Sequence, residues 1–128
     1  MAVLDRGERH HAWAVEQVRR LEAPLLVCEP VLTEAMFLLG RLPAGQDSLL
    51  GLLESVALRL AFPAGDHVPA LRELCRTYRD RPMSLADACV VWMSELFDRH
   101  RVFTLDPDFA VYRKHGSEAI PLIVPPVA

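Results

Sequence analysis

Acidic side chains are the residues of this sequence best suited to do chemistry. Glu34 comes shortly after the apolar run Leu25–Cys28, and Asp106 follows directly on a second apolar run at 102–105. Active groups of parallel α/β sheets collect beyond the carboxyl ends of the strands, so we expect both side chains at one sheet edge. Asp87 begins the helix that precedes the second run, which predicts the same location for it.

Several carboxylates at one edge repel each other at neutral pH, and a hard divalent cation relieves that repulsion. Mg²⁺ prefers oxygen ligands, binds one or two carboxylates directly and keeps waters beside them. A metal-activated water suits the hydrolysis of a phosphodiester without a covalent intermediate. We therefore predict a Mg²⁺ site formed by Glu34, Asp87 and Asp106, with Asp108 close by.

The elements that would position these acids alternate between strands and helices. Short apolar runs predict strands at 25–28, 101–105 and, more weakly, 121–124, and alternation predicts another at 56–62. Apolar residues spaced three and four apart predict helices at about 10–21, 31–40, 49–54, 66–79 and 85–100. Asp47 or Ser48 is the expected cap of the third helix. This order predicts a mostly parallel sheet covered by helices.

Composition and charge limit the class of protein. With 128 residues and 52% hydrophobic content, the chain can bury a core, and we expect one domain over residues 1–128. No apolar stretch reaches bilayer length and the start lacks a secretory pattern, so we expect a cytoplasmic protein without membrane contact. A net charge of −3 predicts that any RNA binds a local patch. Cys28, Cys75 and Cys89 are too widely spaced for a zinc site and are expected to be buried.

Each acid also has an ordinary structural interpretation. Ser84 and Asp87 have the spacing of a capping box, in which Asp87 would only stabilise its helix. Glu34 suits the first turn of a helix because of the helix dipole. Asp106 and Asp108, on either side of a proline, suit a turn. Taken singly these interpretations are favoured, and only the joint presence of the acids favours a metal site.

Other polar and aromatic residues are expected to be structural. His10 and His11 are adjacent at a helix start and point in different directions, so a surface role is favoured over a metal site. Trp13, Trp92 and Phe97 fit a core or an interface at helical spacing. Surface positions are expected for Arg41, Arg79, Arg81, Arg99, Arg101 and Arg113, and those near the acids are candidates for binding phosphate.

Three segments together resemble successive acidic motifs of PIN domains, in particular those of VapC-type toxins from toxin–antitoxin modules. The segments are 31–35, 82–88 and 102–109, centred on Glu34, Asp87 and Asp106. Their order and spacing agree with the family over nearly the whole chain. The segment 4–13 is similar to the end of the family's first helix and its turn.

The resemblance implies a three-layer α/β sandwich with a central, mostly parallel sheet flanked by helices. It implies a ribonuclease dependent on Mg²⁺ or Mn²⁺, in which Glu34, Asp87 and Asp106 are metal-site acids and Asp108 is a supporting one. It also implies an RNA substrate, a cognate antitoxin and a homodimer.

The family's amino-terminal central strand, which ends in an aspartate, has no counterpart in this sequence. Asp5 is the only early aspartate, and its surroundings match the later turn better than a strand end. Three explanations stay open: a start upstream of Met1, a defective product, or residues 2–5 in the place of that strand.

Two other functions compete with the nuclease. The first is a catalytically inactive PIN module that binds an antitoxin-like peptide, or a second copy of itself, through apolar helices. The second is an α/β phosphatase with an acidic Mg²⁺ site, although the sequence lacks a nucleophilic aspartate at the end of a first strand.

Overall fold

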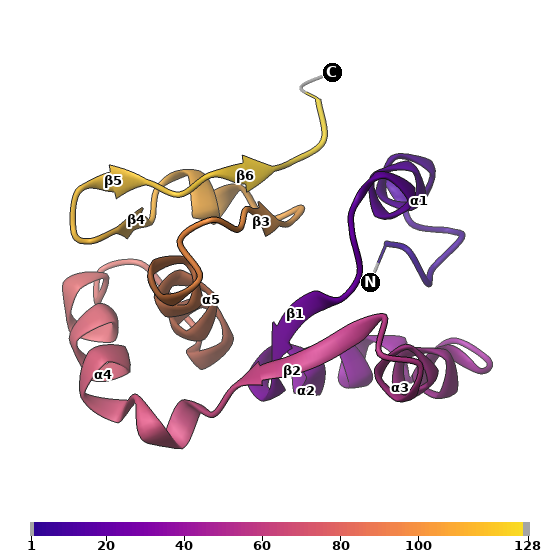
Figure 1. The fold of residues 1–128 in the computed structure, drawn as a ribbon, viewed down its shortest axis with the longest axis horizontal. Helices are drawn as coiled ribbons and strands as arrows, with labels where there is room; N and C mark the ends of the chain where they lie inside the picture. The colour runs from indigo at the N-terminus through magenta and orange to yellow at the C-terminus, as the bar shows by residue number, and fades with distance from the viewer. Residues whose placement is uncertain (1, 127–128) are drawn as a thin grey trace. The chain divides into compact units, whose positions relative to one another are not determined.

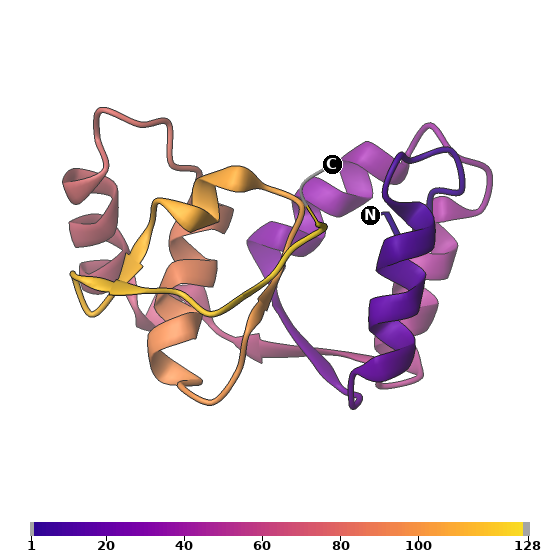
Figure 2. The same cartoon turned by 90° about the horizontal axis from the view of Figure 1, so that it is seen from above.

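The computed structural model describes residues 2–126. The chain forms two compact units, of which the first ends at Phe62 and the second begins at Pro63. Figures 1 and 2 show the elements of both units. The prediction of one domain over residues 1–128 stays a prediction.

The first unit is built on two parallel strands, β1 (Leu25–Cys28) and β2 (Leu58–Phe62), which lie side by side in Figure 1. The register pairs Leu25 with Leu58 and is interrupted between Val27 and Cys28. β1 has the predicted bounds, because its apolar run is closed on either side by a proline-containing segment.

Three helices accompany this strand pair: α1 (His11–Arg20), α2 (Glu29–Leu39) and α3 (Gly45–Glu54). A proline in the first turn of α2 suits a helix start, where its missing N–H is harmless. α2 contacts β1 and α3, and α3 contacts β2. The buried apolar residues of this unit include Cys28, Leu39, Leu49 and Phe62.

The turns on either side of α3 hold residues other than glycine in the left-handed backbone region. Ala44 has a φ of 58° and Val56 has a φ of 65°. No side-chain hydrogen bond caps the start of α3, so the prediction that Asp47 or Ser48 caps it is wrong. The backbone conformation of Ala44 leads directly into the helix at Gly45 instead.

Residues 2–5 form turns and no strand, so they do not take the place of a sheet strand. The Asp5 side chain is 9% exposed, and its Oδ2 pairs with Nη2 of Arg41 at 2.8 Å. Its Oδ1 accepts the backbone N–H of Gly7 at 2.9 Å. Because both oxygens are used in these contacts, Asp5 has a structural role in the first unit.

The second unit begins with the short helix η1 (Ala64–Asp66), followed by α4 (Val68–Thr77) and α5 (Leu85–Leu96). Asp66 therefore ends η1 and does not begin α4, and α5 stops before the predicted end near residue 100. Next come β3 (Val102–Phe103), η2 (Pro107–Ala110), β4 (Arg113–Lys114), β5 (Glu118–Ala119) and β6 (Leu122–Ile123). β3 and β6 are parallel, whereas β4 and β5 form an antiparallel hairpin.

Aromatic side chains dominate the core of the second unit. Val91, Phe109, Tyr112 and Ile120 are buried together. The Tyr112 ring meets the rings of Tyr78 and Phe109 edge-on, with centroid distances of 5.0 and 5.2 Å. α4 and α5 pack against each other beside this cluster.

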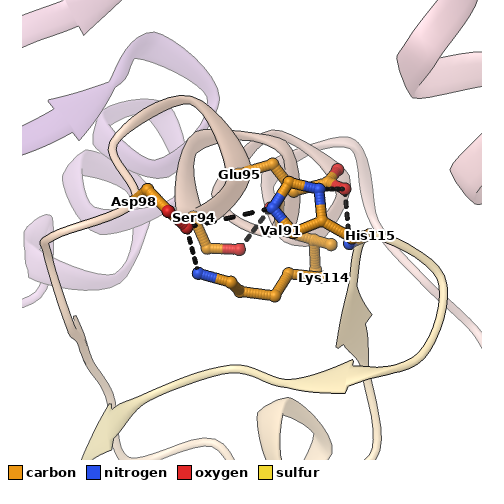
Figure 3. Close-up of polar contacts among 6 residues, drawn as sticks. All are labelled: Val91, Ser94, Glu95, Asp98, Lys114 and His115. Carbon is orange, nitrogen blue, oxygen red and sulfur yellow. Dashed lines mark hydrogen bonds and ion pairs between the residues drawn. The ribbon is translucent and has the colours of Figure 1, made fainter.

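Charged side chains fasten the β4–β5 hairpin to the end of α5 (Figure 3). Nζ of the buried Lys114 donates to Oδ1 of Asp98 at 2.5 Å, and His115 Nδ1 lies 3.2 Å from Glu95 Oε1. The Lys114 hydrogen bond and charge hold the pKa of Asp98 below its ordinary value, and His115 adds to this lowering. His115 and Gly116, in the three-residue connection between Lys114 and Glu118, have left-handed φ angles of 51° and 79°.

The prediction of an α/β fold is confirmed, and two of the strand pairs are parallel. In the described part of the chain each sheet has two strands. The finer prediction, a PIN-like three-layer sandwich with a central sheet, stays a prediction. Among residues 2–126, no helix is long and apolar enough to cross a bilayer.

Candidate functional site

Asp87 lies in the first turn of α5, where the predicted capping box is present. The backbone N–H of Asp87 donates to Ser84 Oγ at 3.0 Å. In return, Asp87 Oδ2 accepts the backbone N–H of Ser84 at 3.1 Å. The structural interpretation of Asp87 is therefore confirmed, and its side chain is half-buried at the helix start. A negative charge is also favoured there by the helix dipole.

Asp106 and Asp108 follow β3 in a tight turn that leads into η2. Oδ1 of Asp106 accepts the backbone N–H of Asp108 at 2.9 Å, and Thr104 Oγ1 accepts the N–H of Asp106 at 3.0 Å. The turn chemistry expected of this segment is confirmed. Asp108 Oδ1 forms an ion pair with Nη1 of Arg81 at 2.9 Å. Both carboxylates are half-buried.

Besides burial, the negative charges of these three carboxylates each raise the pKa of Tyr112. Tyr112 is completely buried, and its hydroxyl donates to Asp87 Oδ2 at 3.4 Å. Burial raises the pKa of Tyr112 to about 12, and the negative charges of Asp87, Asp108 and Asp106 add to the shift. Two acidic segments that are well separated in the sequence therefore lie close to one phenol within the second unit.

Two residues that bind these acids were not assigned such roles from the sequence. No role was predicted for Tyr112, and Arg81 was expected as a surface residue. The segment before α5 also supplies Tyr78, whose hydroxyl accepts the backbone N–H of Arg113 at 2.9 Å. No local spacing rule connects these pairs, because each joins separate elements.

Glu34 lies on α2 and is exposed. It belongs to the first unit, whereas Asp87, Asp106 and Asp108 belong to the second. The prediction that Glu34 shares an ion with Asp87 and Asp106 therefore stays a prediction.

The fit of a divalent cation can be judged from the donor atoms of the second unit. Carboxylate oxygens suit Mg²⁺ and Mn²⁺. Each of the three acids already uses one oxygen in a hydrogen bond or ion pair: Oδ2 of Asp87, Oδ1 of Asp106 and Oδ1 of Asp108. Within residues 2–126, no group of three or more His, Cys, Asp or Glu side chains is placed to hold a metal ion. The donor type fits the metal, and the grouping of the ligands is not confirmed.

The histidine and cysteine predictions have mixed outcomes. His11 Nδ1 lies 2.6 Å from the carbonyl oxygen of Ala2, which supports a structural role. Cys28 and Cys89 are buried as expected. Cys75 is exposed on α4, so the prediction of a buried side chain is wrong there.

No protein-family model matches this chain, and no curated protein matches it either. The resemblance of its acidic segments to PIN domains stays a prediction.

Proposed function

We propose that this protein is a metal-dependent ribonuclease whose second unit supplies Asp87, Asp106 and Asp108 to the reaction. The observation that supports the proposal is that both acidic segments contact Tyr112: Asp87 Oδ2 accepts its hydroxyl at 3.4 Å, and the carbonyl oxygen of Asp108 accepts its backbone N–H at 3.1 Å. Like charges gathered in this way are costly unless cations compensate them. Arg81 compensates Asp108 in part, and a bound divalent ion would compensate the rest.

In this proposal the acids hold and orient Mg²⁺ or Mn²⁺ through the carboxylate oxygens that are not already used. When bound, such an ion supplies an activated water and neutralises charge on a phosphate. Arg81 is 41% exposed beside Asp108, so its guanidinium can also contact an anionic substrate.

The sequence resemblance extends the proposal beyond the second unit. Glu34 is proposed as a further metal-site acid on the strength of its motif. The same resemblance supports a toxin of a toxin–antitoxin module, located in the cytoplasm, with a cognate antitoxin and a homodimeric state.

A cleavage assay with matched acid-to-amide variants tests the proposal. RNA of mixed sequence is incubated with the wild type in Mg²⁺, in Mn²⁺ and in a chelator, and with Asp87→Asn, Asp106→Asn and Glu34→Gln. Glu73→Gln, an exposed carboxylate of α4, is the control. We expect metal-dependent cleavage that falls by at least roughly 100-fold in Asp87→Asn and Asp106→Asn, because metal-assisted stabilisation contributes several kcal/mol.

Asparagine keeps an acceptor for the Ser84 N–H, so Asp87→Asn is expected to stay folded, which circular dichroism would verify. The proposal fails if the wild type cleaves no RNA with either metal. It also fails if Asp87→Asn cleaves RNA as fast as the wild type and as the control Glu73→Gln. Loss of activity in Glu34→Gln alone would overturn the proposed role of the second unit.

A binding module is the second candidate, because α2 exposes large apolar side chains. Phe37 is 83% exposed and Leu38 is 49% exposed. Exposed apolar residues that are adjacent often mark a protein interaction site. Two results together would favour this candidate. The wild type would show no nuclease activity, and it would self-associate in a way that Phe37→Ser abolishes.

A further inference from the structure

We infer that the second unit carries an arginine surface that binds the phosphate groups of an RNA strand. The arginine surface lies along α4 and around Tyr78, and it consists of Arg72, Arg76, Arg79, Arg81 and Arg113. The choice of RNA as the bound polyanion rests on the proposed function. The binding itself uses no metal ion, so it can be tested separately from cleavage.

Three of these arginines lie on the solvent side of α4 and of the turn that ends it. Arg72 and Arg76 are four residues apart in the helix, and both are exposed. Arg79 is also exposed, and its N–H donates to the carbonyl oxygen of Arg76 at 3.3 Å. The opposite side of α4 faces the core, because Leu71 is buried and Leu74 packs against the aromatic cluster. The three side chains therefore start from neighbouring surface positions.

Tyr78 brings two further arginines to the end of α4. Its carbonyl oxygen accepts the N–H of Arg81 at 2.9 Å. Its hydroxyl accepts the backbone N–H of Arg113 at 2.9 Å, although Arg113 lies on β4, 35 residues later in the sequence. The arginine surface is therefore assembled from two separate elements by tertiary contacts, and it is more than a polar helix face.

Most of the positive charge in the arginine surface is not compensated by acids. Among residues 2–126, no carboxylate forms an ion pair with Arg72, Arg76 or Arg79. Nη1 of Arg113 donates to two backbone carbonyl oxygens, which orient the guanidinium and leave its charge in place. The segment 72–81 holds four arginines and two acids, Glu73 and Asp80, so its formal charge is 4 − 2 = +2.

The chemistry of this surface favours phosphate over a protein partner. A guanidinium group binds phosphate oxygens through two parallel hydrogen bonds, so several of them together suit a chain of phosphates. A protein interface usually has an apolar centre, whereas in α4 the one exposed large apolar side chain is Val68, at the helix start. Arg81 forms an ion pair with Asp108 at 2.9 Å, so RNA held here would pass next to an acid proposed for the reaction.

The test measures RNA binding to the full chain by fluorescence anisotropy. A labelled single-stranded RNA of mixed sequence is titrated in a chelator at several KCl concentrations. The first variant is Arg76→Gln/Arg79→Gln, which changes two exposed side chains that form no ion pair with residues 2–126. The control is Arg99→Gln/Arg101→Gln, which removes the same charge from two exposed positions of the same unit outside the arginine surface. Thermal unfolding verifies that all these proteins are folded.

We expect Arg76→Gln/Arg79→Gln to bind RNA about 10-fold more weakly than the wild type, because it loses two charge-assisted contacts. The control should stay within about 2-fold of the wild type. The slope of log affinity against log salt should become shallower by about 1.4 in the first variant, since each phosphate contact of a single strand contributes about 0.7. Arg72→Gln repeats the test at another position, with an expected change in slope of about 0.7.

Two results would overturn the arginine surface directly. One is a wild type that binds no RNA in the chelator, and the other is equal binding of RNA by Arg76→Gln/Arg79→Gln and by the control. Displacement of the RNA by polyglutamate at the same concentration of charge would also overturn it, in favour of an acidic protein partner.

The outcomes also separate this inference from the proposed function. If RNA binds through these arginines but the wild type cleaves none with Mg²⁺ or Mn²⁺, the proposed nuclease fails and the arginine surface is supported. If the wild type cleaves RNA but the arginine variants bind it as tightly, only the arginine surface is overturned.

Discussion

The two units of this chain hold their acidic residues in different ways. In the first unit Glu34 is exposed on α2, and no hydrogen bond or ion pair from residues 2–126 reaches its carboxylate. In the second unit Asp87 is bound by Ser84 and Tyr112, and Asp108 is bound by Arg81.

The carboxylates that are held in place also differ in how many of their oxygens are used. Asp5 of the first unit uses both oxygens for Gly7 and Arg41, which gives it a structural purpose. Asp87, Asp106 and Asp108 of the second unit are held through one oxygen each. A side chain held through one oxygen is oriented and can still offer the other to a ligand, which is the property that preorganised sites require.

The largest expected effect concerns the pKa of Tyr112, which tests how the second unit places its acids. In a Tyr78→Phe background Tyr112 is the single tyrosine, because the chain has two. Absorbance of the ionised phenol should then show a midpoint near the raised pKa of about 12 in place of the ordinary 10.0. Adding Asp87→Asn should lower this pKa, because it removes a negative charge next to the phenol.

The sign of the accompanying stability change follows from proton binding. Between pH 10 and 12 the folded chain keeps the Tyr112 proton while the unfolded chain loses it, so stability should fall as pH rises through this range. Circular dichroism would separate ionisation in the folded state from unfolding. A midpoint at the ordinary value in a folded chain would show that Tyr112 is neither buried nor close to the acids of the second unit.

A smaller effect is expected from the start of α5. Ser84→Ala removes the Oγ that accepts the Asp87 N–H, and loss of such a cap costs about 1 kcal/mol of stability. Ser48→Ala is the matched control in the first unit, because no side-chain hydrogen bond caps α3. Urea unfolding should show the loss for Ser84→Ala and no loss for Ser48→Ala. Equal losses would remove the distinction between the two helix starts.

The sequence predicted best those elements whose signals are local. The apolar run Leu25–Cys28 became β1 with the same bounds, because its neighbours on either side contain proline. The capping box of Ser84 and Asp87 was predicted because both hydrogen bonds join residues within one helical turn. Such features depend on short-range geometry and need no knowledge of distant contacts.

The β4–β5 hairpin could not be predicted in the same way, because its strands carry Arg113, Lys114 and Glu118 and lack an apolar alternation. Lys114 is buried, although lysine side chains are usually exposed. Its ion pair with Asp98, which follows α5, makes this burial possible. The bond between Tyr112 and Asp87 was missed for the same reason, since it depends on tertiary packing.

The smallest expected effect concerns two residues in the left-handed backbone region, one from each unit. The first unit places Val56 at a φ of 65°, whereas the hairpin turn of the second places Gly116 at 79°. A left-handed conformation costs a residue with a Cβ about 1–2 kcal/mol, and part of the relief in Val56→Gly is offset by the entropy of glycine. Val56 is 59% exposed, so its side chain contributes little burial. We expect Val56→Gly to raise stability by about 0.5 kcal/mol and Gly116→Ala to lower it by about 1 kcal/mol, both measured by urea unfolding.

If Val56→Gly lowers stability instead, then packing of the valine side chain outweighs the backbone strain, and the turn after α3 is held as firmly as the hairpin.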